Sequence, residues 1–256
     1  MARPSSPETR LSPPPILRKA GLVLPLLLLA GGLLEVALFW RGVHHARSLA
    51  ARGRRYERRL AAKGTTILIL GDSTGVGVGA SQPEESIAGL LAADFPDADI
   101  VNVSESGARL ADAVAQAAGC MASGLHFDVA VLHVGGNDIV RATPTDKLVE
   151  DCETLMRELA RLARRTVWLG PPNLGMAPLV PPPYSWLLAA RSRNASRVFA
   201  RSAARHKVSF VDFSAPSHSV HFGRRRQHFA SDGFHPNSTS YRHGYAVARE
   251  AMDLPA

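Results

Sequence analysis

From residue 64 onward, short apolar runs alternate with longer stretches of helical periodicity, and this alternation restricts the fold more than any other feature. The first run, Thr66–Leu70, is continuously apolar, as expected of a strand that is buried on both faces. The predicted strands are Thr66–Leu70, Asp99–Val103, Asp128–Val134, Thr166–Leu169 and Val208–Asp212. The predicted helices are Glu84–Asp94, Leu110–Ala122, Thr145–Arg164, Trp186–Arg205 and Ser238–Met252. The alternation predicts a three-layer α/β/α domain with a five-stranded parallel sheet. Ser81 and Glu84 are expected to form a capping box at the first helix.

A long apolar run precedes this region. Residues 20–40 form a 21-residue stretch that contains a single acid, Glu35, and this length is enough for a helix to cross a bilayer. Arg18 and Lys19 precede the run, and Trp40 closes it as an interfacial residue would. We therefore expect a disordered basic N-terminus (1–19), a single transmembrane anchor (20–40), a basic juxtamembrane linker (41–63) and a folded domain (64–256). A cleaved signal peptide and a buried helix are the alternatives.

The positive charge of the chain lies outside the predicted domain. Residues 1–63 contain 12 Lys and Arg against three acids, whereas residues 64–256 contain 18 against 19. A nucleic-acid-binding domain carries its basic residues on the folded part, so we expect no nucleic-acid partner. The excess of arginine after the apolar run places the domain on the cytoplasmic side of a membrane by the positive-inside rule, and an exported location stays open.

Polar residues that carry chemistry follow several of the predicted strands. Gly71-Asp72-Ser73 follows the first strand, Gly107 lies after the second, Gly135-Gly136-Asn137-Asp138 follows the third, and Asp232-Gly233-Phe234-His235 comes after the fifth. The working residues of open parallel sheets lie on loops at the carboxyl ends of the strands. Serine, histidine, aspartate and oxyanion donors are the groups that acyl transfer requires.

These four blocks together resemble the SGNH (GDSL-like) hydrolase family over roughly residues 64–252. Gly71, Asp72 and Ser73 match its first block, and Gly107 matches the second. Gly135, Asn137 and Asp138 match the third, and Asp232 and His235 match the last. The letters GDSL in the family's other name stand for the motif Gly-Asp-Ser-Leu, and Thr74 occupies the position of its leucine. The resemblance implies a flavodoxin-like α/β/α hydrolase domain over 64–256 with sheet order 2-1-3-4-5 and no cofactor or metal.

The resemblance also implies a role for each matched residue. Ser73 is expected to attack the ester carbonyl, His235 to accept its proton, and Asp232 to orient the imidazole. The oxyanion hole is expected to comprise the backbone N–H groups of Ser73 and Gly107 and the side-chain amide of Asn137. Asp72 and Asp138 are expected to be structural.

The expected activity is hydrolysis of carboxylic esters of small molecules or lipids, with lysophospholipids, thioesters and carbohydrate acetyl groups as open substrate classes. An acyl groove is expected along the Pro-rich loop, lined by Leu174, Met176, Leu179, Tyr184 and Trp186. The alternative function is a catalytically silent, membrane-anchored binding or scaffold protein with the same fold. Cys120 and Cys152 form either a disulfide or two buried thiols. The oligomeric state is left open.

Overall fold

The computed structural model describes residues 15–60, 64–219 and 226–252, and for residues 15–28 and Ser219 it describes the backbone alone. The chain divides into two compact units, Met1–Arg41 and Gly42–Ala256. The larger unit contains every residue expected to take part in chemistry.

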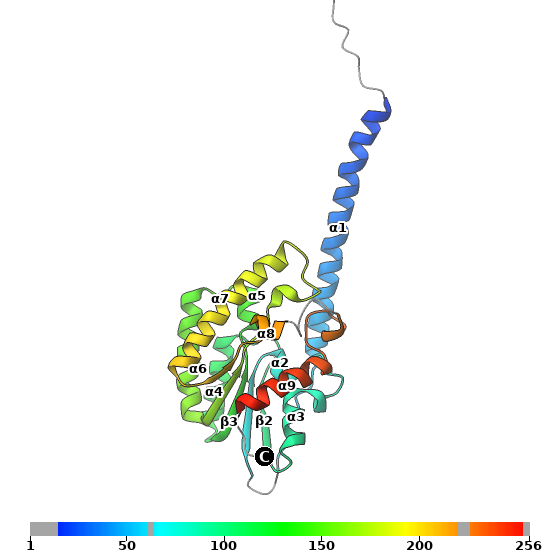
Figure 1. Cartoon of the computed structure of the whole chain (residues 1–256). Helices are drawn as coiled ribbons and strands as arrows, with labels where there is room; N and C mark the ends of the chain where they lie inside the picture. Colours follow the sequence, from blue (N-terminus) through cyan, green and yellow to red (C-terminus); the bar gives the residue numbers. More distant parts are fainter. Residues whose placement is uncertain (1–14, 61–63, 220–225, 253–256) are drawn as a thin grey trace, which may run out of the picture. The chain divides into compact units, whose positions relative to one another are not determined.

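A five-stranded parallel sheet forms the centre of the larger unit, and its order is β2-β1-β3-β4-β5 (Figure 1). The strands are β1 (Thr66–Gly71), β2 (Asp99–Asn102), β3 (Phe127–His133), β4 (Ala163–Leu169) and β5 (Ser209–Val211). Gly71 of β1 is in register with His133 of β3, so these two strands end together. The predicted strand order is confirmed, and the carboxyl ends of β1, β2 and β3 lie at one edge of the sheet.

Helices cover both faces of the sheet, because alternate side chains of each strand point to opposite sides. Leu68 and Leu70 of β1 pack into one core, with helices α4, α6 and α7. Ile67 and Ile69 pack into a second core, with helices α3 and α9. Figure 1 shows these two helix layers on either side of the strands. The helices are α1 (Pro15–Arg52), α2 (Ser73–Val76), α3 (Ile87–Asp94), α4 (Leu110–Ala122), α5 (Gly136–Arg141), α6 (Thr145–Leu162), α7 (Tyr184–Arg205), α8 (Pro216–Ser219) and α9 (Ser238–Met252), with 3-10 turns η1 (Pro83–Glu85), η2 (Leu174–Met176) and η3 (Arg226–His228).

The start of α3 differs from the prediction. The helix begins at Ile87, after the turn η1, and its N-cap is Ser86, whose hydroxyl accepts a hydrogen bond from the Gly89 N–H at 3.2 Å. The predicted capping box of Ser81 and Glu84 is wrong because Ser81 bonds to Ser238 instead. Ser86 directly precedes the helix, and its hydroxyl satisfies the otherwise unpaired N–H of the third helical residue, Gly89.

The transmembrane helix expected at residues 20–40 is not supported. These residues lie within α1, but no helix in the described ranges is both long and apolar enough to cross a membrane. Where the side chains of α1 are described, from Leu29 onward, Glu35 and Arg41 interrupt the apolar sequence. Side chains 20–28, and residues 1–14 of the expected disordered N-terminus, lie outside the described part of the chain. The location of the domain relative to a membrane stays a prediction.

Residues 42–60, expected to form a linker, belong to the same compact unit as the sheet. The backbone of Arg58 pairs with Ile100 of β2 through two hydrogen bonds of 3.0 and 2.8 Å. Its guanidinium group donates to the carbonyl oxygens of Ala92, Phe95 and Ala98. Hydrogen bonds from a charged donor are stronger than neutral ones, so Arg58 fastens this segment to the end of α3 and to the outer strand.

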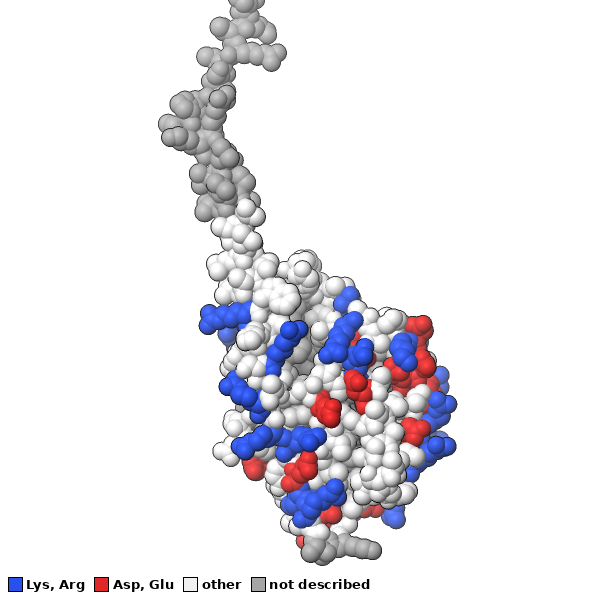
Figure 2. Space-filling model, turned by 180° about the vertical axis from the view of Figure 1, so that it is seen from behind, with Lys and Arg blue, Asp and Glu red and all other residues white. Residues whose placement is uncertain are grey.

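The surface of the larger unit carries charged side chains of both signs. Lys and Arg are interspersed with Asp and Glu on the face shown in Figure 2, as the near-neutral charge of residues 64–256 predicts.

Cys120 and Cys152 are both buried free thiols. Of the two alternatives, a disulfide or two buried thiols, the structure therefore contains the two thiols.

Candidate active site

The loops that carry the predicted residues converge at the carboxyl edge of β1, β2 and β3. Ser73 is the first residue of α2, directly after β1, and lies against His235 of the loop that precedes α9. The Asn137 amide donates to the carbonyl oxygen of Ala108, which neighbours Gly107, at 3.0 Å. The structure thus brings together the blocks that lie after four different strands.

Ser73, His235 and Asp232 form a continuous hydrogen-bonded series. The Ser73 Oγ lies 3.1 Å from the His235 Nε2, and the His235 Nδ1 lies 2.5 Å from the Asp232 Oδ2. All three residues are buried, with 9% or less of their surface exposed. Each distance is short enough for proton transfer or orientation in acyl transfer.

Asp232 is fixed by its own loop as well as by His235. Its Oδ1 accepts the backbone N–H groups of Phe234 and His235 at 2.9 and 3.0 Å. Burial alone would raise the pKa of this carboxyl, but the bonds from His235 and from the two backbone groups outweigh burial, and the pKa is lowered. Asp232 is therefore an ionised hydrogen-bond partner on the Nδ1 side of His235, and the Nε2 of the same ring faces Ser73.

The nucleophile loop is shaped by Asp72, which caps α2. Its Oδ1 accepts the Thr74 N–H at 2.9 Å, and its own N–H donates to the His133 carbonyl at 2.7 Å. As the first helical residue, Ser73 has a backbone N–H with no acceptor within the helix, so it is available to an oxyanion. Burial raises the pKa of Asp72 to about 6.

The raised pKa of Asp72 predicts a pH dependence of stability. The folded state holds the Asp72 proton more tightly than the unfolded chain does, so the stability it gives is full below the unfolded pKa and is lost as pH rises through about 6. The difference between the ordinary pKa of 3.8 and the folded pKa of about 6 corresponds to about 3 kcal/mol of folding free energy. Asp72→Asn keeps the helix-capping oxygen and cannot ionise, so its free energy of unfolding should not fall between pH 4 and 6. Denaturant titrations over this range, with the exposed Asp146→Asn as the control, test this, and parallel curves for variant and wild type would contradict it.

Gly107 has a conformation that favours glycine. Its φ is +88°, a region that side-chain-bearing residues rarely adopt. Apart from its two chain neighbours, only the Arg141 Nη2 among the described atoms lies within 4 Å of where its Cβ would stand, at 3.6 Å. The positive φ, and not a lack of room for a side chain, is therefore what favours glycine at this position.

Asn137 and Asp138 hold the third loop against the second. Besides the bond from Asn137 to Ala108, the Asp138 Oδ2 accepts the Leu110 N–H at 3.0 Å and its Oδ1 accepts the Thr143 hydroxyl at 3.0 Å. The Asn137 amide nitrogen carries two hydrogens, so the bond to Ala108 leaves the second for an oxyanion. Burial raises the pKa of Asp138, although the hydrogen bonds from Leu110 and Thr143 act in the opposite direction. Both contacts hold the loop in place, as expected of a structural residue.

Three further residues support the loops and were not predicted to do so. Asn102 donates to the Gly75 carbonyl at 2.9 Å and accepts the Ser104 N–H, which joins the first loop to the second. Gln116 of α4 bonds both backbone groups of Gly71 at 2.8 and 3.0 Å, and the Tyr241 hydroxyl donates to the Val78 carbonyl at 2.9 Å. Asn102 stands at the end of a predicted strand, and this position could have indicated its role, whereas the other two lie within predicted helices.

No group of His, Cys, Asp or Glu in the described ranges is placed to hold a metal ion.

A buried serine–histidine–aspartate series at the carboxyl edge of a parallel α/β/α sheet defines a serine hydrolase. The model of the GDSL-like lipase/acylhydrolase family matches residues 69–243, and the chain belongs to this family. It is therefore a serine ester hydrolase of the SGNH type.

Solved structures show the same fold at low sequence identity. A structure of TesA is 22% identical with a TM-score of 0.59, covering 74% of this chain and 98% of that one. The acetylxylan esterase Axe2 from Geobacillus stearothermophilus is 19% identical with a TM-score of 0.60, covering 76% and 96%. The esterase EstA from a Pseudoalteromonas species is 21% identical with a TM-score of 0.53, covering 73% and 97%. A comparison with curated protein sequences found no match.

Proposed function

We propose that the protein hydrolyses carboxylic esters through Ser73, His235 and Asp232. Ser73 attacks the carbonyl carbon while the His235 Nε2 accepts the hydroxyl proton, and His235 then returns the proton to the departing alcohol. Water attacks the resulting acyl-enzyme by the same route and releases the acid. The oxyanion of each tetrahedral intermediate accepts from the N–H groups of Ser73 and Gly107 and from the Asn137 amide. The observation that carries this proposal is the buried series with spacings of 3.1 and 2.5 Å.

The acyl chain is proposed to lie along the Pro-rich loop at Leu179. The Leu179 N–H donates to the Gly233 carbonyl at 3.0 Å, which ties this loop to the one that carries Asp232 and His235. Leu174, expected in the same groove, instead packs into the core of the α4, α6 and α7 side. Tyr184 and Trp186 are 59% and 68% exposed, so they lie at the surface and do not form a closed wall. This arrangement favours short acyl chains over long ones.

The test of this proposal is hydrolysis of p-nitrophenyl esters from acetate to laurate by the full-length chain. We expect turnover with a maximum at short chains. Rates that rise toward laurate would show that the substrate is a long-chain lipid. A folded wild-type protein that neither hydrolyses any ester nor reacts with a fluorophosphonate would instead be the silent binding or scaffold protein.

Removing the side-chain donor of the oxyanion hole should slow the reaction without abolishing it. Asn137→Ala is expected to lower kcat by about 10²–10³-fold, because a donor aimed at the developing negative charge is lost. The KM for p-nitrophenyl acetate should change little, since the ground-state carbonyl carries less charge. Asn194→Ala, on the exposed face of α7, is the matched control. An equal kcat for Asn137→Ala and wild type would exclude this amide from the oxyanion hole.

A further inference from the structure

The segment Gly42–Glu57, which we call the brace, precedes the matched family region 69–243 and contacts several loops of the site. Near its start, the His45 Nε2 lies 2.9 Å from the hydroxyl of Ser231, the neighbour of Asp232. Further along, a Cβ on Gly53 would stand 2.8 Å from Val78 and 3.0 Å from Val76, so the brace backbone lies directly against the helix that begins at Ser73. A segment outside the family domain thus touches both the nucleophile helix and the histidine loop.

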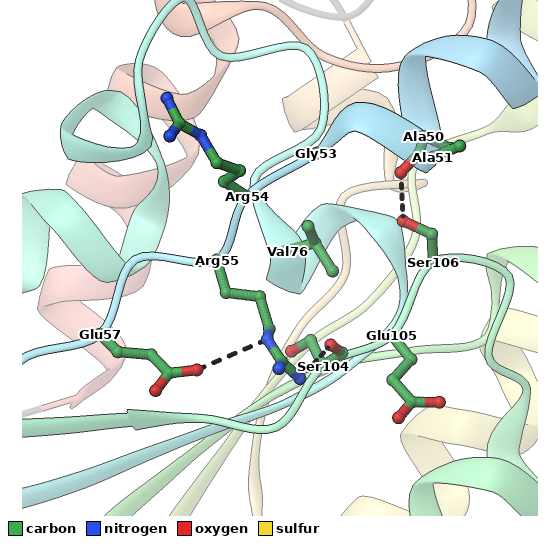
Figure 3. Close-up of a pocket in the computed structure, with 10 residues that line it drawn as sticks. All are labelled: Ala50, Ala51, Gly53, Arg54, Arg55, Glu57, Val76, Ser104, Glu105 and Ser106. Atoms are coloured by element: carbon green, nitrogen blue, oxygen red, sulfur yellow. Dashed lines mark hydrogen bonds and ion pairs between the residues drawn. The ribbon is translucent and has the colours of Figure 1, made fainter.

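The brace also holds the loop that leads to Gly107. The Ser106 hydroxyl donates to the Ala50 carbonyl at 3.1 Å, and the Arg55 Nη1 donates to the Ser104 carbonyl at 3.3 Å. Glu57 lies 3.5 Å from the Arg55 Nε and orients the guanidinium group toward the loop. Figure 3 shows both contacts converging on residues 104–106.

A pocket lies beside these contacts, between parts of the brace and this loop. It is lined by Ala50, Ala51, Gly53, Arg54, Arg55, Glu57, Val76, Ser104, Glu105 and Ser106 (Figure 3). Ser104 is buried, but Glu105 and Ser106 are exposed and border the pocket, so side-chain packing does little to fix these two residues. The bonds from Arg55 to Ser104 and from Ser106 to Ala50 therefore tie this side of the loop to the brace. They act together with the bonds that the Ser104 and Glu105 N–H groups donate to Asn102 and Gly71.

We propose that Arg55 and Ser106 are positioning residues for the oxyanion hole. They act on Gly107 through the backbone of the loop and do not touch substrate. Loss of either bond lets the loop shift, so that the Gly107 N–H no longer points at the oxyanion when charge develops on it. The inference rests on the proposed oxyanion role of Gly107. Small displacements of positioned groups have large effects on rate because the transition state requires near-ideal geometry.

The chain contains a matched control beside Arg55. Arg54 lines the same pocket and has the same charge, but in Figure 3 its side chain points away from residues 104–106. Arg54→Ala therefore removes a positive charge from the pocket without removing the restraint. Ser106→Thr keeps the hydroxyl donor and serves as the conservative variant.

The experiment compares Arg55→Ala, Ser106→Ala and the double variant with Arg54→Ala and Ser106→Thr in the full-length chain. We expect kcat for p-nitrophenyl acetate to fall about threefold in each single variant and about tenfold in the double, which is a modest loss of transition-state stabilisation. KM and the thermal midpoint should stay near wild type. The rate of Ser73 labelling by a fluorophosphonate should fall in parallel with kcat, because that reaction also develops charge on an oxygen in the hole. Arg54→Ala and Ser106→Thr should resemble wild type.

Three results would overturn the inference. One is an unchanged kcat in the double variant, and another is an equal loss in Arg54→Ala. The third is a loss of kcat that accompanies a lowered thermal midpoint, which indicates a merely structural role. A wild-type protein with neither turnover nor labelling would refute the proposed function itself, and the inference with it.

Discussion

Replacing Ser73 by alanine should lower the kcat for p-nitrophenyl acetate by at least about 10⁴-fold, the range seen when a triad member is removed from serine hydrolases. Without the hydroxyl, His235 has no proton to accept, and no acyl-enzyme forms. The change is small in volume, and the hydrogen bond that the Ser73 hydroxyl loses is the one to His235, so the protein should remain folded. Residual turnover would come from the oxyanion donors alone.

The measurement is kcat together with the intact mass after fluorophosphonate treatment. Wild type should gain one adduct and Ser73→Ala none. Ser123→Ala, at the end of α4 and remote from the site, is the control and should behave as wild type. A Ser73→Ala protein that keeps its turnover or its adduct would show that another residue is the nucleophile.

Replacing Asp232 by asparagine should cost about 10⁴-fold in kcat, although it adds no volume. The amide oxygen can still accept the N–H groups of Phe234 and His235, which hold the loop. The amide NH₂ then faces the His235 Nδ1, 2.5 Å away in the native protein, and it favours the tautomer with the proton on Nε2. In that tautomer Nε2 cannot accept the proton of Ser73.

This variant separates orientation from folding. Its thermal midpoint at neutral pH should fall only modestly, and its binding of a non-hydrolysable ester analogue should persist, while turnover is lost. The lowered pKa of Asp232 means that its stabilising charge is present at neutral pH and is lost only as pH falls through the folded pKa. Asp97→Asn, an exposed change, is the control. Near-native turnover in Asp232→Asn would exclude Asp232 from orienting His235.

Much of the domain could be predicted from the sequence because local pattern and topology agree. The continuous apolar runs of β1 and β3 are buried on both faces, and Leu110–Ala122 and Ser238–Met252 form helices with the predicted bounds. The parallel sheet then requires its strand ends to meet at one edge, which is why residues as distant in sequence as Ser73 and His235 were expected to be neighbours.

The remaining features depend on contacts that pattern cannot reveal. Gln116 lies in a helix, where its spacing resembles that of any half-exposed polar residue, yet it bonds both backbone groups of Gly71. The pKa of Asp72 is raised by burial, and burial at that position depends on the packing of several loops. The basic character of residues 41–63 indicated a juxtamembrane linker, because the sequence does not show that the Arg58 guanidinium would bond to three carbonyl oxygens at and after the end of α3.

The pairing of Arg58 with Ile100 also covers part of an outer strand of the sheet. β2 is an outer strand of the sheet, and an uncovered outer strand offers free N–H and C=O groups to a second molecule. The opposite outer strand, β5, spans only Ser209–Val211 and offers little to pair with. On the β2 side, Arg58 occupies the backbone groups of Ile100 and places a charged residue along the edge. A shortened chain that begins at residue 64 would lack this cover, and we expect it to form edge-to-edge dimers or aggregates even though every catalytic residue is retained.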